Sequence, residues 1–171
     1  TFPPYIQVGI LLHRAIDEFT DKHNVFRQST KRLHYRYSHY SGVIVDIFYD
    51  HYLAKNWMDY CNIPLDIYSH EFYSILKDHS NILPPRIVNL MPYLIRDNWL
   101  LSYSTIEGIT KVLNGMNRRT ENKGKINNAI NELQDYYFEF EHEFKLFFDE
   151  AITFSKEKKI QLLSQNDLIS P

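Results

Sequence analysis

Apolar residues recur along this chain mainly at the three- and four-residue spacing of α-helices that bury one face. Only 5 Gly and 7 Pro interrupt the pattern, and the period-two alternation typical of strands is scarce. In the first segment the apolar positions are Ile6, Ile10, Ala15, Ile16 and Phe19. The pattern predicts helical segments over residues 4–22, 24–33, 41–60, 64–79, 84–97, 104–119 and 125–159.

Local signals set several of these boundaries. Ser41 is an expected N-cap, and Ser104 with Glu107 has the spacing of a capping box. Pro92 should kink or interrupt its helix, because proline lacks an amide donor. The chain after residue 161 is polar and is expected to fray. We therefore predict one all-α domain, a helical bundle with a long C-terminal helix.

The composition narrows the possible partners. The 171 residues are 44% hydrophobic. Their net charge is −2, so the overall charge of the protein would not attract nucleic acid or an anionic membrane. The single Cys61 excludes an internal disulfide and a cysteine-rich zinc site. No apolar run approaches the roughly 18 residues that span a bilayer. We expect a protein without nucleic acid or membrane partners in a reducing, cytoplasmic setting.

A first polar cluster is predicted on the helix over 4–22. His13, Asp17 and Asp21 are four residues apart, so they project from one side of that helix. Imidazole and carboxylate groups in this arrangement suit a cation such as Mn²⁺ or Mg²⁺. The same spacing also fits an ordinary solvated face, with Arg14 neutralising Glu18.

A second acidic pair lies in a strongly apolar helix. Asp46 and Asp50 are again four apart, and His51 follows directly. These carboxylates need a partner, either a metal ion or an Arg or Lys from another helix, because an unpaired buried charge is costly. Two helices that each carry Asp and His at helical spacing satisfy what a metal site in a bundle requires. The chemistry would be hydrolysis, in which the cation lowers the pKa of a bound water.

Basic residues gather in three places. Arginine binds phosphate oxygens in bidentate fashion, and a basic stretch can dock an acidic partner. For the residues between 27 and 36 the alternative is a solvated charged surface. For Arg118 and Arg119 it is a structural role, because positive charges at a helix C-terminus interact favourably with the helix dipole. The groups are Arg27, Lys31, Arg32 and Arg36; then Arg86; then Arg118 and Arg119.

Several motifs, in order, resemble bacterial acyl carrier protein phosphodiesterases. The first runs from Gly9-Ile10 through His13-Arg14-Ala15-Ile16-Asp17 to Thr20-Asp21. The second is Asp46 to Trp57, and further matches are Leu83-Pro84-Pro85-Arg86, the Trp99 region and Val112 to Arg119. The resemblance extends from Pro3 to Arg119, and that family is similar to divergent HD-type phosphohydrolases, which are helical.

The resemblance implies removal of 4′-phosphopantetheine from holo-acyl carrier protein, with Mn²⁺ as the preferred divalent cation. It implies metal ligation by His13, Asp17, Asp46 and Asp50. His51 would either support a metal ligand without binding the metal itself or act as a general acid. Arg14 and Asp21 would be further catalytic residues. Phosphate contacts would come from Arg86, Arg118 and Arg119. The basic residues 27–36 would dock the acidic carrier protein.

Two alternatives to this function stay open. One is an HD-like phosphohydrolase that acts on a nucleotide or another small phosphodiester, and the other is a non-catalytic helical module that binds the carrier protein. Family members also carry a preceding segment with a Gly-(Asn/Asp)-x-x-x-Asp-(Phe/Tyr) motif, which this sequence does not contain. We expect that segment to supply at least one further Asp to the site.

Overall fold

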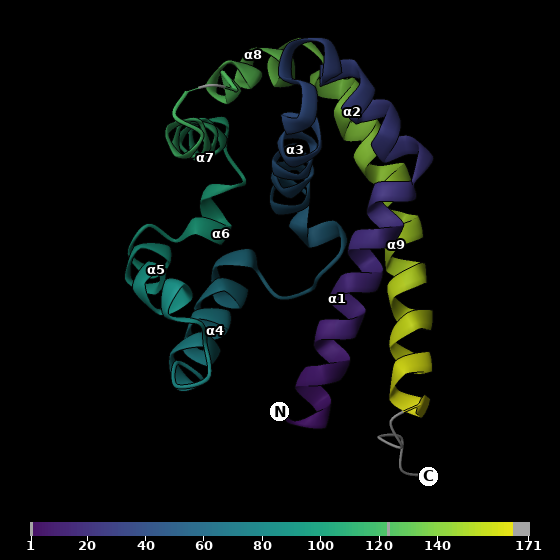
Figure 1. The fold of residues 1–171 in the computed structure, drawn as a ribbon, viewed down its shortest axis with the longest axis vertical. Coiled ribbons are helices and arrows are strands. Elements are labelled where there is room, and N and C mark those ends of the chain that lie inside the picture. Colours follow the sequence, from purple (N-terminus) through teal and green to yellow (C-terminus); the bar gives the residue numbers. More distant parts are fainter. Residues whose placement is uncertain (1, 123, 166–171) are drawn as a thin grey trace.

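The computed structural model describes residues 2–122 and 124–165, and this part of the chain is helical and contains no strand (Figure 1). The prediction of an all-α fold with a long C-terminal helix is confirmed. The helices are α1 (Pro4–Lys22), α2 (Asn24–Tyr37), α3 (Ser41–Lys55), α4 (Leu65–Asp78), α5 (Pro85–Arg96), α6 (Trp99–Ser102), α7 (Ile106–Arg119), α8 (Ala129–Asp135) and α9 (Tyr137–Gln165). Short 3-10 turns are η1 (Ser38–Tyr40), η2 (Trp57–Asp59) and η3 (Ile126–Asn128).

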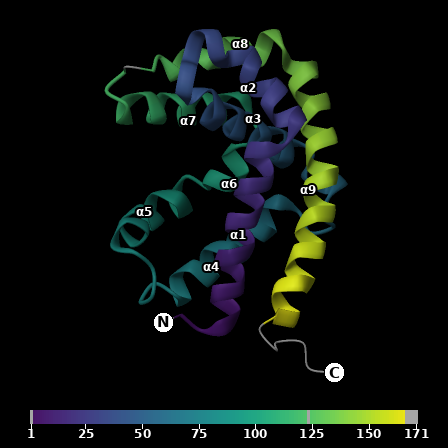
Figure 2. The ribbon, with the colours of Figure 1, turned by 45° about the vertical axis from the view of Figure 1, so that its right-hand side comes forward.

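The central element is α3, which packs against α2, α7 and α9. Ile44, Val45, Phe48 and Tyr52 of this helix are fully buried. A helix that is apolar on most sides belongs in a core, which explains why α3 shows no single apolar stripe. α1 packs lengthwise on α9, and the two run side by side in both views (Figures 1 and 2).

The remaining helices α4, α5 and α6 form a corner of their own. They contact one another, and α6 contacts α7. Figures 1 and 2 show α4 and α5 on the side of the molecule away from α9. This corner forms one wall of the apolar cavity described below.

The prediction for the end of α3 is wrong. The helix ends at Lys55 and η2 follows, so it does not continue to Tyr60. Asn56 leaves the helical conformation, and its side-chain amide donates to Glu141 of α9 at 2.9 Å. This tertiary bond lies outside what local periodicity can predict.

The predicted helix over 125–159 is also divided. Tyr136 ends α8, and a new helix starts at Tyr137, whose carbonyl accepts a 2.7 Å hydrogen bond from the Tyr52 hydroxyl. α9 runs to Gln165 and does not fray at 161; residues 166–171 of the predicted tail lie outside the described residues. No helix in the described ranges is both long and apolar enough to cross a membrane.

Both predicted caps are shifted. Thr105 caps α7 in place of Ser104, since its hydroxyl accepts from the Gly108 amide at 3.1 Å. Glu107 pairs with Lys111 at 2.7 Å, so it does not complete a capping box. Ser41 is the first residue of α3, and its hydroxyl donates to the Ser38 carbonyl.

Two further boundaries differ from the prediction. α2 is longer than predicted and reaches Tyr37. α5 runs through Pro92 without interruption.

Candidate functional site

On α1, the first polar cluster lies on the surface. The Nδ1 atom of His13 is 3.0 Å from Oδ2 of Asp17, and the two side chains are 78% and 62% exposed. Asp21 follows one turn later and is also exposed. The helical spacing therefore brings an imidazole and two carboxylates to one accessible face.

On α3, Asp46 and Asp50 are exposed positions of a largely buried helix, as is Lys55 at its end. Protein atoms around the two carboxyl groups nevertheless displace part of their hydration. Burial raises the pKa of Asp50 to about 7, and the charge of Asp46 adds to this. Burial also raises the pKa of Asp46 to about 6.

The acids of the two helices act on one another. After burial, the charges of Asp21 and then Asp17 are the next causes of the raised pKa of Asp46. The carboxylates of Asp17 and Asp21 on α1 therefore lie near enough to Asp46 on α3 to disfavour its ionised form. We call Asp17, Asp21, Asp46 and Asp50 the acidic cluster.

A cation would compensate this negative charge. The ion pairs and hydrogen bonds of the described residues include no partner for Asp46 or Asp50, so the Arg or Lys considered from the sequence does not supply one. Carboxylate oxygens suit hard divalent cations. Within the described ranges no three His, Cys, Asp or Glu side chains are arranged to hold a metal ion. The acidic cluster thus has the charge and the ligand type that suit a cation, but its side chains do not converge closely enough in this structure to surround one.

His51 does not face the acidic cluster. Its ring is almost fully buried, with Nδ1 at 2.8 Å from the Tyr103 carbonyl and Nε2 at 2.8 Å from the Tyr137 hydroxyl. A carbonyl only accepts, so Nδ1 carries the proton and Nε2 accepts from Tyr137. Burial is the main cause that lowers the pKa of His51 and favours this neutral form. The ring therefore ties α3 to the end of α6 and to the start of α9.

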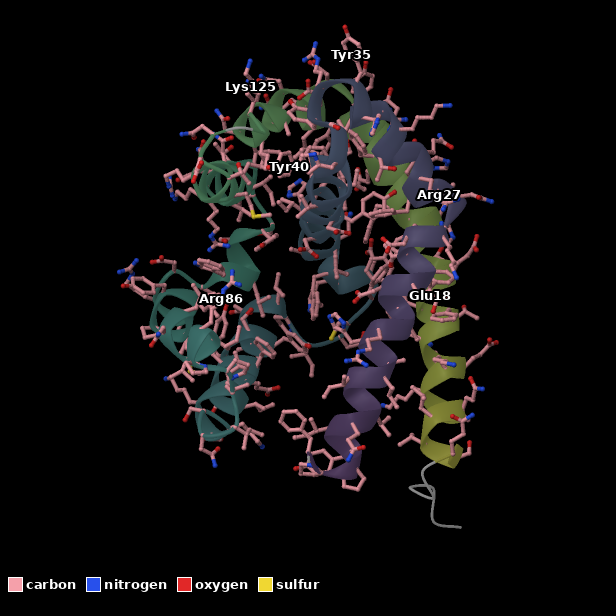
Figure 3. The ribbon with its side chains drawn as sticks, viewed as in Figure 1. Glu18, Arg27, Tyr35, Tyr40, Arg86 and Lys125 are labelled. Atoms are coloured by element: carbon pink, nitrogen blue, oxygen red, sulfur yellow. The ribbon has the colours of Figure 1, made fainter. Side chains whose placement is uncertain are left out.

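Among the predicted phosphate ligands, Arg119 shares an electrostatic neighbour with Asp50, the phenol of Tyr103. Burial and then the charge of Asp50 raise the pKa of Tyr103 to about 12, whereas the charge of Arg119 lowers it. Arg119 and Asp50 therefore both act on the same phenol. Arg118 and Arg14 are exposed, and Arg86 lies on α5 (Figure 3).

Two basic residues of α2 form ion pairs with acidic residues of the same protein. Arg32 forms two hydrogen bonds with Glu143 of α9, at 2.7 and 2.6 Å, and Arg36 pairs with Glu132 of α8. The Arg32 side chain is only 20% exposed. Arg32 is thus a structural residue, although the sequence alone suggested partner binding.

Other basic residues of α2 remain on its surface. Arg27 donates its Nε–H to the Asp21 carbonyl at 3.0 Å and stays exposed, as does Lys31. Figure 3 shows Arg27 at the outer edge of α2 and Tyr35 pointing away from the body of the protein. Tyr35 is 97% exposed.

Sequence reasoning missed an apolar cavity beside the acidic cluster. It has a volume of about 220 Å³ and lies between α3, η2 and the α4–α6 corner. Its walls are mainly aromatic and aliphatic, and one carboxyl group, from Asp50, is part of them. The high aromatic content was the available signal, but periodicity assigned those side chains to packing. The lining residues are Asp50, Leu53, Ala54, Trp57, Leu65, Tyr68, Phe72, Tyr73, Leu94, Trp99, Leu100 and Tyr103.

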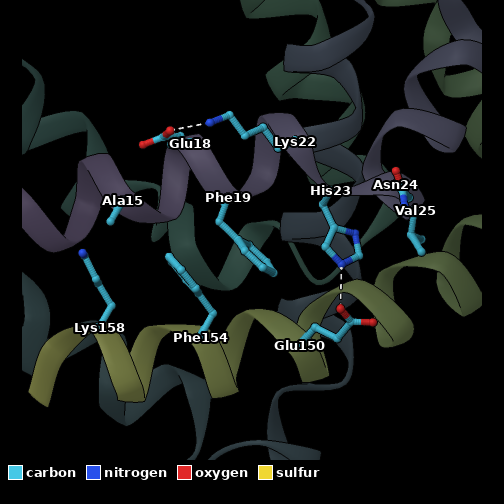
Figure 4. A pocket seen from close by; sticks show the side chains of 10 residues that line it. All are labelled: Ala15, Glu18, Phe19, Lys22, His23, Asn24, Val25, Glu150, Phe154 and Lys158. Carbon is cyan, nitrogen blue, oxygen red and sulfur yellow. Dashed lines mark hydrogen bonds and ion pairs between the residues drawn. The ribbon is translucent and has the colours of Figure 1, made fainter. Parts of the chain in front are cut away.

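A larger cavity, of about 760 Å³, lies between α1 and α9 (Figure 4). Among its polar residues, Lys22 pairs with Glu18, and Nε2 of His23 lies 3.2 Å from a carboxylate oxygen of Glu150. The Nδ1 atom of His23 is buried and has no hydrogen-bond partner among the described residues. No member of the acidic cluster lines this cavity, so its greater size does not make it the candidate site.

Comparison with known proteins agrees with the motif resemblance. The sequence profile of acyl carrier protein phosphodiesterase matches residues 1–151. A protein of that name from Yersinia enterocolitica is 28% identical over 162 residues, covering 93% of this chain and 83% of the relative. Another from Klebsiella pneumoniae is 29% identical over 171 residues, with the same coverage. One from Photorhabdus laumondii is 27% identical, and the match covers 94% of this chain and 81% of that relative.

No solved structure matched the chain. The profile match contains both helices of the acidic cluster, the apolar cavity and the C-terminal end of α7. It spans most of the sequence, and the chain therefore belongs to the acyl carrier protein phosphodiesterase family.

Proposed function

We propose that this protein hydrolyses the phosphodiester that joins 4′-phosphopantetheine to a serine of holo-acyl carrier protein. The observation that carries the proposal is the acidic cluster, in which α1 and α3 direct carboxylates to one region without a cationic partner for Asp46 or Asp50. The names of the relatives supply the substrate. In the reaction, a water oxygen bonds to phosphorus and the bond from phosphorus to the serine oxygen breaks. The serine hydroxyl gains a proton, and 4′-phosphopantetheine leaves.

We propose that Asp46 and Asp50 would hold a divalent cation, with Mn²⁺ as first choice. Asp17 and His13 would complete the ligand set by moving closer, since no three such side chains converge in the described ranges. When bound, such a cation would supply acidification of a water molecule and screening of the phosphoryl charge. Support comes from the raised pKa values of Asp46 and Asp50, together with the position of Asp50 in a cavity wall, because such groups are candidate functional residues. Isothermal titration with Mn²⁺ should give one binding event that Asp46→Asn weakens at least tenfold.

The protein's own side chains would perform the remaining tasks. We assign Asp21 as a proton acceptor for the attacking water, since its charge already acts on Asp46. Arg14 and Arg119 would hold phosphate oxygens, and Arg86 and Arg118 would supply further phosphate contacts. We assign His51 a positioning role and not that of general acid, because both ring nitrogens already bond within the protein.

We propose that Arg27 and Lys31 on the exposed face of α2 receive the acidic carrier protein, together with the exposed part of Arg36. The same proposal includes a cytoplasmic location, consistent with the free thiol of Cys61. Incubation of holo-carrier protein with the metal-loaded protein tests the function. Cleavage of a small diester without release of the arm would favour the alternative phosphohydrolase instead.

A further inference from the structure

We propose that the apolar cavity beside Asp50 binds the pantetheine part of the substrate arm, while the acidic cluster acts on its phosphate. This inference rests on the proposed function for the identity of the arm. It adds a binding site for the uncharged part of the arm that stays attached to the phosphoryl group.

The geometry of Asp50 links the two regions. This residue belongs to the acidic cluster and also forms part of the cavity wall. A ligand whose phosphate lies at the acids therefore has its next atoms at the cavity. The rim residues Tyr68 and Phe72 are 39% and 37% exposed, so the cavity opens to the outside.

The walls are suited to an uncharged chain. Tyr73 uses its hydroxyl inside the fold, where it donates to Asn98 at 3.3 Å and accepts from the Leu100 amide at 3.0 Å. The indole N–H of Trp57 donates to the Ile63 carbonyl at 2.7 Å. With these polar groups satisfied, the two side chains offer mainly ring surface to a ligand.

Pantetheine matches this surface in chemistry. It carries a geminal dimethyl group, two amides and a terminal thiol, and its only strong charge is the phosphate at one end. Apolar walls with a few polar groups are typical of small-molecule sites. A nucleotide would instead bring a polar base edge and ribose hydroxyls, which need hydrogen-bond partners when buried.

The two tryptophans of the chain, Trp57 and Trp99, both line the cavity. Their fluorescence therefore reports binding without any need for turnover or metal. Titration of the wild-type protein with free pantetheine should give a saturable change. Ala54→Phe fills the cavity and should weaken this binding at least tenfold. Ala15→Phe, in the α1–α9 cavity, is the matched control and should leave binding unchanged.

Kinetics provide the second readout. Ala54→Phe should lower kcat/KM for holo-carrier protein at least tenfold, whereas the control Ala15→Phe should leave kcat/KM unchanged. Tyr68→Ala removes an aromatic ring at the rim of the cavity, whose centroid lies 4.8 Å from that of the Trp57 ring. This variant should weaken pantetheine binding without adding bulk. This variant keeps the test valid if Ala54→Phe disturbs α3.

The outcomes separate the two proposals. One outcome is that wild-type protein cleaves holo-carrier protein, its fluorescence does not change on addition of pantetheine, and Ala54→Phe keeps full kcat/KM. The cavity assignment is then overturned and the proposed function stands. If pantetheine binds and Ala54→Phe blocks it, but no arm is released, the cavity assignment stands and the proposed function fails.

Discussion

Removal of a carboxylate from the acidic cluster should stabilise the metal-free protein. Asp50 has a raised pKa because burial and the charge of Asp46 both disfavour its ionised form. The substitution Asp50→Asn keeps the shape of the side chain and removes the charge. We therefore expect a higher free energy of unfolding at pH 8 with a chelator present, together with loss of turnover.

The magnitude follows from the difference between folded and unfolded pKa values. An ordinary aspartate has a pKa of 3.8, so a folded-state value of about 7 would correspond to roughly 4 kcal/mol at full strength. Asp50 is exposed, and solvent screening reduces this to about 1 kcal/mol. The destabilisation is absent below the unfolded pKa, grows as the pH rises towards the folded pKa of about 7, and is complete above it.

Urea unfolding at pH 8 and at pH 4 measures this directly. Asp50→Asn should gain about 1 kcal/mol, or about 2–4 °C in Tm, at pH 8 and much less at pH 4. Asp97→Asn is the control, because Arg96 lowers the pKa of Asp97 and its removal should bring no gain. A clear loss of stability for Asp50→Asn at pH 8 would refute the reasoning, since it would mean that the Asp50 carboxylate has a stabilising structural partner.

Three further predictions concern the scaffold and the docking face. Glu143→Gln should lower the free energy of unfolding by about 3 kcal/mol in urea titrations, because it leaves Arg32 half-buried without its partner; a loss under about 1 kcal/mol would contradict this. Lys31→Glu should raise KM for holo-carrier protein at low salt with kcat unchanged, and an unchanged KM would remove α2 from the docking face. Gly108→Ala should lower Tm, since a Cβ atom would lie 1.8 Å from the Ser102 carbonyl oxygen at a cost of about 1–3 kcal/mol; an unchanged Tm would show that the backbone there yields easily.

Much of the helical framework was predictable, because helix spacing is a local property of the sequence. α1 matches its predicted bounds, and α4 lies within one residue of its prediction. The errors fall where tertiary bonds override local pattern. The Tyr52 hydroxyl bonds to the backbone of Tyr137 at the start of α9, and Asn56 bonds to Glu141 just beyond α3. Neither partner is close in sequence, so no local rule identifies them.

The candidate site was predictable in part. Four-residue spacing correctly placed Asp46 with Asp50, and Asp17 with Asp21, each on one helix face. That the two faces act on a common region depends on the packing of the whole bundle. The role of Arg32 could not be predicted, since its partner Glu143 is separated from it by 111 residues.

The most direct test of the account is the intact mass of holo-acyl carrier protein after incubation with this protein and Mn²⁺. We predict a mass loss equal to the 4′-phosphopantetheine arm with the wild-type protein, and none with Asp50→Asn. An unchanged carrier mass with wild-type, Mn²⁺-loaded protein would contradict the proposed function, and full loss with Asp50→Asn would remove Asp50 from the chemistry.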